Sequence, residues 1–264
     1  MELRGEGREH IATGASPAER AEARRLFSSR DVAIIGVTAY TRFAFLEEQA
    51  RRENEKRLLA FVELAADLGA PFLRTLISPW GHELDAGVVQ RIAEESLNRV
   101  AEGMAGFPVK VLVETHDRTS RARDLEPILR QVPSQAIGVL WDMAHSYGRG
   151  ESLQASLRLI GRRLGYLHVK DMRCNARGQA LLCLPGEGDL PLLECRRLLL
   201  EWERKWHPEL PPIRLAMERL RALLGGGSGC RRCPGLDISF PIWRPPPALG
   251  AHLPQTERKR VVRR

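Results

Sequence analysis

Four acidic or histidine residues follow four apolar runs in the second half of the chain. They are Glu114 after VLV, Asp142 after GVLW, His168 after GYL and Glu201 after LLL. Carboxylate oxygens with one imidazole nitrogen suit a divalent ion such as Mn²⁺, Mg²⁺ or Co²⁺, and Zn²⁺ also accepts such a set. Each residue alone would more often cap a helix, form an ion pair or pack in a core. Their recurrence after successive runs favours a shared metal site.

The elements that must position these residues alternate between β-rich runs and longer helical patterns, as in parallel α/β folds. Candidate strands cover residues 1–4, 32–37, 72–77, 109–114, 137–142, 164–170 and 198–203. Candidate helices cover residues 17–29, 46–68, 85–103, 121–131, 151–162, 190–197 and 210–224. No glycine-rich phosphate-binding loop follows any strand, so we prefer a TIM (β/α)8-type barrel to a doubly wound open sheet. Because the chain opens inside a strand and supplies seven, we expect a barrel that lacks its first β/α unit.

In a TIM barrel the functional groups lie at the carboxyl ends of the strands, where these four residues fall. The surrounding sequence resembles the sugar phosphate isomerase/epimerase family of the xylose isomerase-like TIM barrel superfamily. The segments that carry the resemblance are ETHD (114–117), VLWDMAHSYGRGES (139–152), LHVKD (167–171), LPGEGDLPL (184–192) and EWERKWHPELPP (201–212). In addition, ELRGEG followed by SPAERAEARRLF looks like the second strand and helix of that family. The resemblance spans roughly residues 2–224.

The resemblance implies one divalent metal ion held by Glu114, Asp142, His168 and Glu201. It implies an isomerase or epimerase of a small sugar, sugar phosphate or polyol-derived ketone. Glu114 and Glu201 would stand on opposite faces of the substrate and transfer a proton through a metal-bound enediolate. His145, three residues beyond Asp142, would be the third catalytic group, close to a substrate oxygen.

Three further residues are expected to bind substrate, namely Arg173, His116 and Lys170. His116 and Lys170 lie within the family-like motifs, although each could instead orient a metal ligand. Arg173 follows His168 by five residues, an offset that does not match the family fully, so a solvated arginine is an equal alternative. Trp141 is expected to pack in the core rather than stack on a sugar.

Two other functions stay open beside the isomerase or epimerase. A metal-dependent lyase or dehydratase would use the same site. A catalytically dead barrel remnant would act as a binding protein, and the junction of residues 190–203 supports this alternative. There the helical pattern runs directly into a strand pattern, whereas a connection of about 2–6 residues is usual. The open edge of an incomplete barrel also favours a homodimer that covers it.

The net charge of +8 is concentrated at the carboxyl end of the 264-residue chain. Residues 225–264 carry eight basic and two acidic side chains and are rich in proline and glycine, so we expect a disordered basic tail after a barrel domain at 1–224. Outside that tail the charges nearly balance, which argues against a nucleic-acid partner. Five cysteines without regular spacing, no secretory signal and no membrane-spanning run favour the cytoplasm.

Overall fold

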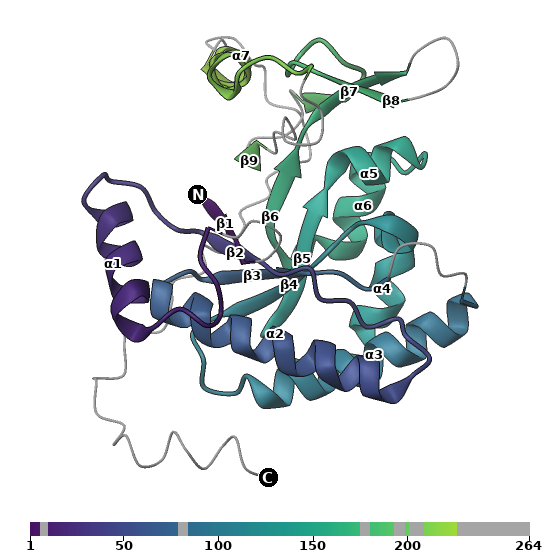
Figure 1. The fold of residues 1–264 in the computed structure, drawn as a ribbon. Helices are drawn as coiled ribbons and strands as arrows, with labels where there is room; N and C mark the ends of the chain where they lie inside the picture. The colour runs from purple at the N-terminus through teal and green to yellow at the C-terminus, as the bar shows by residue number, and fades with distance from the viewer. Residues whose placement is uncertain (6–9, 79–83, 175–179, 193–198, 201–208, 226–264) are drawn as a thin grey trace.

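Parallel pairing of neighbouring strands forms the centre of the fold (Figure 1). The computed structural model describes residues 1–5, 10–78, 84–174, 180–192, 199–200 and 209–225. Within them, a seven-stranded sheet has the order β1-β2-β3-β4-β5-β6-β9, and every neighbouring pair is parallel. The strands are β1 (Glu2–Arg4), β2 (Gly36–Thr38), β3 (Phe72–Thr75), β4 (Lys110–Glu114), β5 (Ile137–Asp142), β6 (Leu164–Val169) and β9 (Leu199–Leu200). Because spatial order follows chain order throughout, the sheet has barrel topology and lacks the reversal of a doubly wound sheet.

Helices fill the connections between the strands and cover the outer side of the curled sheet (Figure 1). They are α1 (Pro17–Ser28), α2 (Glu48–Leu68), α3 (Ala86–Gly103), α4 (Ala122–Arg130), α5 (Met143–Gly148) and α6 (Leu153–Ile160), with short 3-10 turns η1 (Asp117–Thr119) and η2 (Gly161–Arg163). Consecutive helices pack together, α1 on α2, α2 on α3, α3 on α4 and α4 on α6. Every residue of β5 is buried, as expected for a parallel strand covered on both faces.

Local sequence signals explain where several helices begin and end. Ser16 and Glu19 form a capping box at the start of α1. At the end of α2, Gly69 adopts the left-handed conformation with φ of 72°, which glycine tolerates without strain. Asp142 ends β5 and also caps α5, because its side chain accepts a hydrogen bond from the His145 backbone N–H. One carboxylate is thereby fixed at the carboxyl end of the sheet.

The strands of the seven-stranded sheet follow the predicted pattern closely, with one clear error at β2. The prediction places that strand at residues 32–37, but the structure has it at Gly36–Thr38. Val32 is 38% exposed, so the apolar run begins in the connection after α1. Of the predicted helix at 190–197, residues 190–191 are not helical and residues 193–198 lie outside the described part of the chain. The tail was predicted at 225–264; its first residue, Gly225, ends α7, and residues 226–264 lie outside the described part of the chain.

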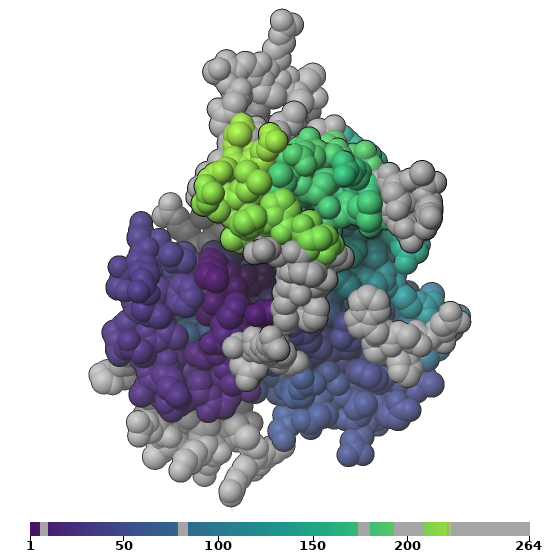
Figure 2. Space-filling view, turned by 45° about the horizontal axis from the view of Figure 1, so that its top comes forward, coloured from purple at the N-terminus to yellow at the C-terminus, as the bar shows by residue number. Residues whose placement is uncertain are grey.

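Beyond β6 the chain forms an antiparallel hairpin that the sequence did not predict. Its strands are β7 (Asp171–Cys174) and β8 (Ala180–Cys183), and the helix α7 (Ile213–Gly225) lies beside it (Figures 1 and 2). An ion pair of 3.2 Å between Arg219 and Glu187 joins α7 to the segment after β8. Because β7 follows β6 directly, these elements stand at the carboxyl end of the sheet.

The buried Asp171 side chain organises the segment after β8. Its two carboxylate oxygens accept four backbone N–H groups, from Met172, Gly186, Gly188 and Leu190, over 2.7–3.3 Å. A Cβ on Gly188 would lie 2.1 Å from Asp171 Oδ1, so glycine is required for this approach.

Among the described residues, no helix combines the length and hydrophobicity that a bilayer crossing requires.

Candidate metal centre

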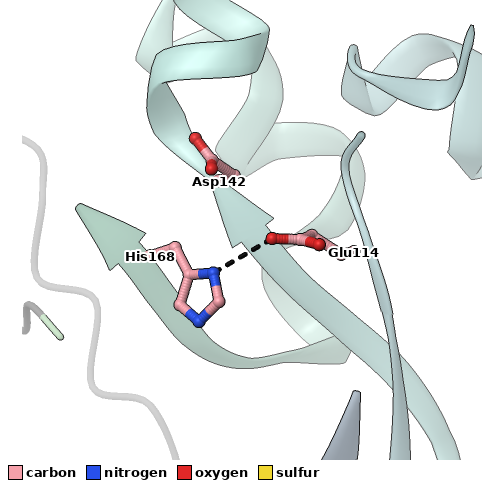
Figure 3. Close-up of side chains that lie close together, drawn as sticks. All are labelled: Glu114, Asp142 and His168. Carbon is pink, nitrogen blue, oxygen red and sulfur yellow. Dashed lines mark hydrogen bonds and ion pairs between the residues drawn. The ribbon is translucent and has the colours of Figure 1, made fainter. Parts of the chain in front are cut away.

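The carboxyl ends of β4, β5 and β6 bring together three of the predicted metal ligands. Glu114 ends β4, Asp142 ends β5, and His168 is paired with Asp142 in the register of β5 and β6. All three are buried, and one potential ligand atom from each lies within 4.8 Å of the others (Figure 3). Ligand atoms that each stand about 2.0–2.6 Å from one ion fall within this spacing. The three donors therefore fit a single divalent ion.

Arg74 on β3 supplies the positive charge that allows Glu114 to be buried. Its Nε donates to Glu114 Oε2 over 2.5 Å, and a second guanidinium nitrogen contacts the same oxygen. Burial alone would raise the pKa of the Glu114 carboxyl, but the Arg74 guanidinium and the hydrogen bond with His168 hold that pKa well below its usual range. Glu114 is therefore ionised, as a metal ligand must be.

The His168 imidazole lies between two carboxylates. Its Nδ1 is 3.0 Å from Glu114 Oε1, and its Nε2 is 2.7 Å from Oε2 of Glu2 on β1. Strands β1 and β6 are not neighbours in the sheet, so Glu2 reaches His168 across the inside of its curve. Burial would raise the pKa of Glu2, but the charge and hydrogen bond of His168 hold it below its usual value.

Asp142 has a buried lysine beside it. Lys170 Nζ lies 2.9 Å from Asp142 Oδ2 and 3.3 Å from His145 Nε2. The His145 ring is 3.4 Å from the same Asp142 oxygen and packs edge-on against His116, with 4.4 Å between the ring centroids. Lys170 is buried, whereas His145 is partly exposed, so the cluster extends from the buried carboxylates toward solvent.

His116 is held by the next residue along the chain. Its Nδ1 is 3.0 Å from Asp117 Oδ1, and Arg42 approaches the other Asp117 oxygen at 3.8 Å. Burial would lower the pKa of His116, but the Asp117 hydrogen bond and the charge of Glu114 raise it above its usual value. Asp117 has a positive φ of 49°, a conformation that costs energy for a residue other than glycine. The His116 ring, in contact with Asp117, packs edge-on against His145.

The family model described as "Xylose isomerase-like TIM barrel" matches residues 1–219. The chain belongs to this family. The match confirms the resemblance inferred from the sequence, and it includes β4, β5 and β6, whose ends form the candidate centre. A comparison with curated proteins gives no significant match.

Solved structures share the xylose isomerase-like barrel fold. The IOLI protein with a bound zinc atom superposes with a TM-score of 0.68 at 14% identity, over 78% of this chain and 82% of that one. D-psicose 3-epimerase with D-tagatose, from Clostridium cellulolyticum, gives 0.65 at 14% identity over 85% and 87%. The probable 3-DHS dehydratase AsbF of Bacillus anthracis gives 0.59 at 14% identity over 78% and 81%. Identities this low show a common fold and do not transfer an activity.

The remaining residues singled out in the sequence of this xylose isomerase-like barrel have different placements. His145, His116 and Lys170 gather beside Asp142, whereas Arg173 is exposed on the hairpin strand β7. Their roles toward a substrate stay predictions. Glu201, the fourth predicted ligand and second catalytic carboxylate, lies outside the described residues. Trp141 is fully buried and donates from its indole N–H to Ser146 Oγ over 2.9 Å, which confirms its packing role.

Sequence reasoning missed two residues of the centre, Arg74 and Glu2. Arg74 interrupts the apolar strand FLRTLI, and a charged side chain inside a buried strand requires a partner of opposite charge. That signal was available, but it does not say which carboxylate is the partner. Glu2 gives a weaker signal, because a polar residue in a three-residue strand at the chain start is ordinarily exposed.

Proposed function

We propose that this protein is a divalent-metal-dependent isomerase or epimerase of a small sugar, sugar phosphate or polyol-derived ketone. The observation that carries the proposal is the buried group of Glu114, Asp142 and His168 at the carboxyl ends of three adjacent parallel strands. Membership of the xylose isomerase-like family supports it, as does the likeness to solved sugar epimerases. The buried carboxylates are also a costly arrangement that a purely structural role does not require.

Glu114, Asp142 and His168 would hold the ion, with Glu201 as the fourth ligand. A divalent ion at this position would polarise a carbonyl oxygen and the neighbouring hydroxyl oxygen and so would acidify the C–H bond of the carbon that bears the hydroxyl. Glu114 is kept unprotonated by Arg74 and is therefore available to accept that proton. If Glu201 returns a proton to the opposite face, the carbon centre is inverted. If the proton returns to the neighbouring carbon, aldose and ketose interconvert.

Lys170 and His145 would bind the substrate on the Asp142 side of the centre. Lys170 Nζ is a buried cation within 3.3 Å of His145 Nε2, and it would donate a hydrogen bond to a substrate oxygen that gains negative charge beside the His145 ring. His116 packs on His145 and would limit the orientations of that ring. We place Arg173 at the solvent side, where it would contact a distal hydroxyl or phosphate group.

A dehydratase is the second candidate, and the pairing of Lys170 with His145 favours it. Elimination of water needs a base for the C–H proton and an acid that protonates the leaving hydroxyl. Glu114 would be the base, and the Lys170–His145 pair would supply the acid. The likeness to the probable dehydratase AsbF is consistent with this chemistry on the same fold.

Proton exchange with solvent tests both candidates before the natural substrate is known. The protein is loaded with Mn²⁺ and incubated in D₂O with panels of ketoses, aldoses, their phosphates and cyclic polyol ketones. An isomerase or epimerase incorporates deuterium next to the carbonyl carbon, whereas a dehydratase gives a product that has lost water. Mass spectrometry separates the two results.

Two variants connect any turnover to the centre. Glu114→Gln and Asp142→Asn should abolish exchange while the circular dichroism spectrum stays native. The matched control is Glu55→Gln, since Glu55 is also buried and ion-paired, with Arg99 at 2.7 Å, but lies on α2 outside the centre. Mn²⁺ binding without exchange on any panel would favour the non-catalytic binding protein, and failure to bind Mn²⁺ would contradict the metal site.

A further inference from the structure

We propose that Glu2 is a positioning residue that orients His168 for metal binding, an inference that rests on the proposed metal centre. Glu2 lies at the opposite end of the chain from the family-like motifs that define the centre. It contacts the candidate ligand His168 and is separate from the group formed by Glu114, Asp142 and His168. Its effect on the metal would therefore act through the imidazole.

The geometry assigns a different task to each nitrogen of the His168 ring. Nδ1 faces Glu114 Oε1 at 3.0 Å, on the side of the other candidate ligands, as Figure 3 shows. Nε2 points away from Glu114 and Asp142 and is 2.7 Å from Glu2 Oε2. A metal ion among the three ligands would therefore be bound by the lone pair of Nδ1, while Nε2 keeps its proton and donates a hydrogen bond to Glu2 Oε2.

Glu2 is itself fixed in the position that this task requires. The Thr38 hydroxyl donates to its other oxygen, Oε1, so the carboxylate cannot rotate freely. Glu2 belongs to β1, which pairs with β2 in the order Glu2 to Gly36 and Arg4 to Thr38. Its side chain is 13% exposed, so little solvent competes for the His168 proton. The carboxylate is held on regular secondary structure before any metal arrives.

The aromatic ring of Tyr166 packs against the His168 ring. The two ring centroids are 5.8 Å apart, and Phe72 packs on Tyr166 at 5.4 Å. These contacts limit movement of the imidazole, while Glu2 selects which nitrogen is protonated. A carboxylate that accepts the N–H of a ligating histidine also increases the electron density on the other nitrogen and so strengthens the metal bond.

Calorimetric titration of Mn²⁺ into the full chain tests this inference through metal affinity, without need of a substrate. Glu2→Ala should weaken Mn²⁺ binding by about 10- to 100-fold, the usual effect of losing such a partner. Glu2→Gln should weaken Mn²⁺ binding less, because the amide oxygen still accepts a hydrogen bond from the Nε2–H group, although it carries no charge. Glu55→Gln removes a buried, ion-paired carboxylate elsewhere and should leave the affinity unchanged.

A nitrogen NMR spectrum of [¹⁵N]histidine-labelled protein loaded with Zn²⁺ separates positioning from a merely structural role. We expect a protonated Nε2 and an unprotonated Nδ1 for His168 in the wild type, and a changed Nε2 signal in Glu2→Ala. Unchanged Mn²⁺ affinity in Glu2→Ala, or a protonated Nδ1, would overturn the inference and leave the metal site intact. A wild-type protein that binds no metal would overturn both the proposed function and this inference.

Discussion

The ion pair between Arg74 and Glu114 should dominate the stability of the metal-free centre. Arg74 is 7% exposed and Glu114 is fully buried, so Arg74→Met leaves a carboxylate without its guanidinium in a site that water barely reaches. Breaking one side of a buried ion pair costs about 3–5 kcal/mol. Since His168 still contacts Glu114 Oε1 at 3.0 Å, we expect a loss near the lower limit, about 3 kcal/mol.

For a domain of this size, that loss lowers the melting temperature by roughly 6–12 °C, at about 2–4 °C per kcal/mol. The assay is thermal unfolding in EDTA, followed by circular dichroism, for wild type and three variants. These are Arg74→Met, Glu114→Gln and the double variant. Because the double variant contains neither an unpaired guanidinium nor an unpaired carboxylate, its destabilisation should be smaller than the sum of the single ones by about 0.5–3 kcal/mol.

Additivity of the two single substitutions would refute the reasoning, since it would mean that the two side chains do not stabilise each other. A melting temperature of Arg74→Met within 2 °C or so of the wild type would refute it as well, because that shift corresponds to less than about 1 kcal/mol. Met is the replacement of choice because it keeps much of the aliphatic volume and avoids a large cavity at β3.

Three further results are expected. Saturating Mn²⁺ at about 100 times its Kd should stabilise the wild type by about 2.7 kcal/mol, and excess EDTA should remove this gain in thermal unfolding. Asp171→Asn leaves two of four backbone N–H groups facing an amide NH₂, so unfolding free energy should fall by about 2 kcal/mol. Hydrogen exchange at Gly186 and Gly188 should accelerate. Gly138→Ala brings a Cβ within 2.7 Å of a carbonyl oxygen and should cost about 1–3 kcal/mol, whereas Gly161→Ala, with nothing within 4 Å, should not.

The parts of the centre that the sequence predicted are those that follow from strand topology. Glu114, Asp142 and His168 each come at or near the end of a strand that is recognisable by its apolar run. Parallel strands that are adjacent in a sheet bring their carboxyl ends to one edge, so their terminal side chains converge without further information. The fold class could be predicted for a similar reason, because alternating strands and helices leave few topologies.

What the sequence could not supply was the set of contacts that depends on the curvature of the sheet. Glu2 and His168 are separated by 166 positions in the chain and by several strands in the sheet, so no periodic pattern relates them. The β7–β8 hairpin was missed because its strands are only four residues long and DMRC, the sequence of β7, is not an apolar run. Before β2, the connection after α1 is as apolar as the strand itself, so composition does not separate the two. The predicted strand therefore began at residue 32 instead of Gly36.

The charges around the candidate ligands explain how the centre can be buried before a metal binds. Arg74, Glu114, His168 and Glu2 form a continuous chain of contacts from β3 through β4 and β6 to β1. Within this chain each carboxylate has a partner that is a cation or an N–H donor, and Lys170 does the same for Asp142. The candidate ligands are therefore already oriented, so metal binding would require little free energy to order their side chains.

The same chain of contacts divides the two oxygens of Glu114 between two tasks. Arg74 occupies Oε2, whereas Oε1 faces His168 Nδ1. Glu114 Oε1 and His168 Nδ1 would hold a divalent ion, which would polarise the substrate, while the Arg74 ion pair stays on Glu114 Oε2. Arg74 and Glu2 fix the orientations of the Glu114 carboxylate and the His168 ring. The thermal unfolding of the Arg74 and Glu114 variants in EDTA tests the contact behind Glu114. The Mn²⁺ titration of the Glu2 variants tests the contact behind His168.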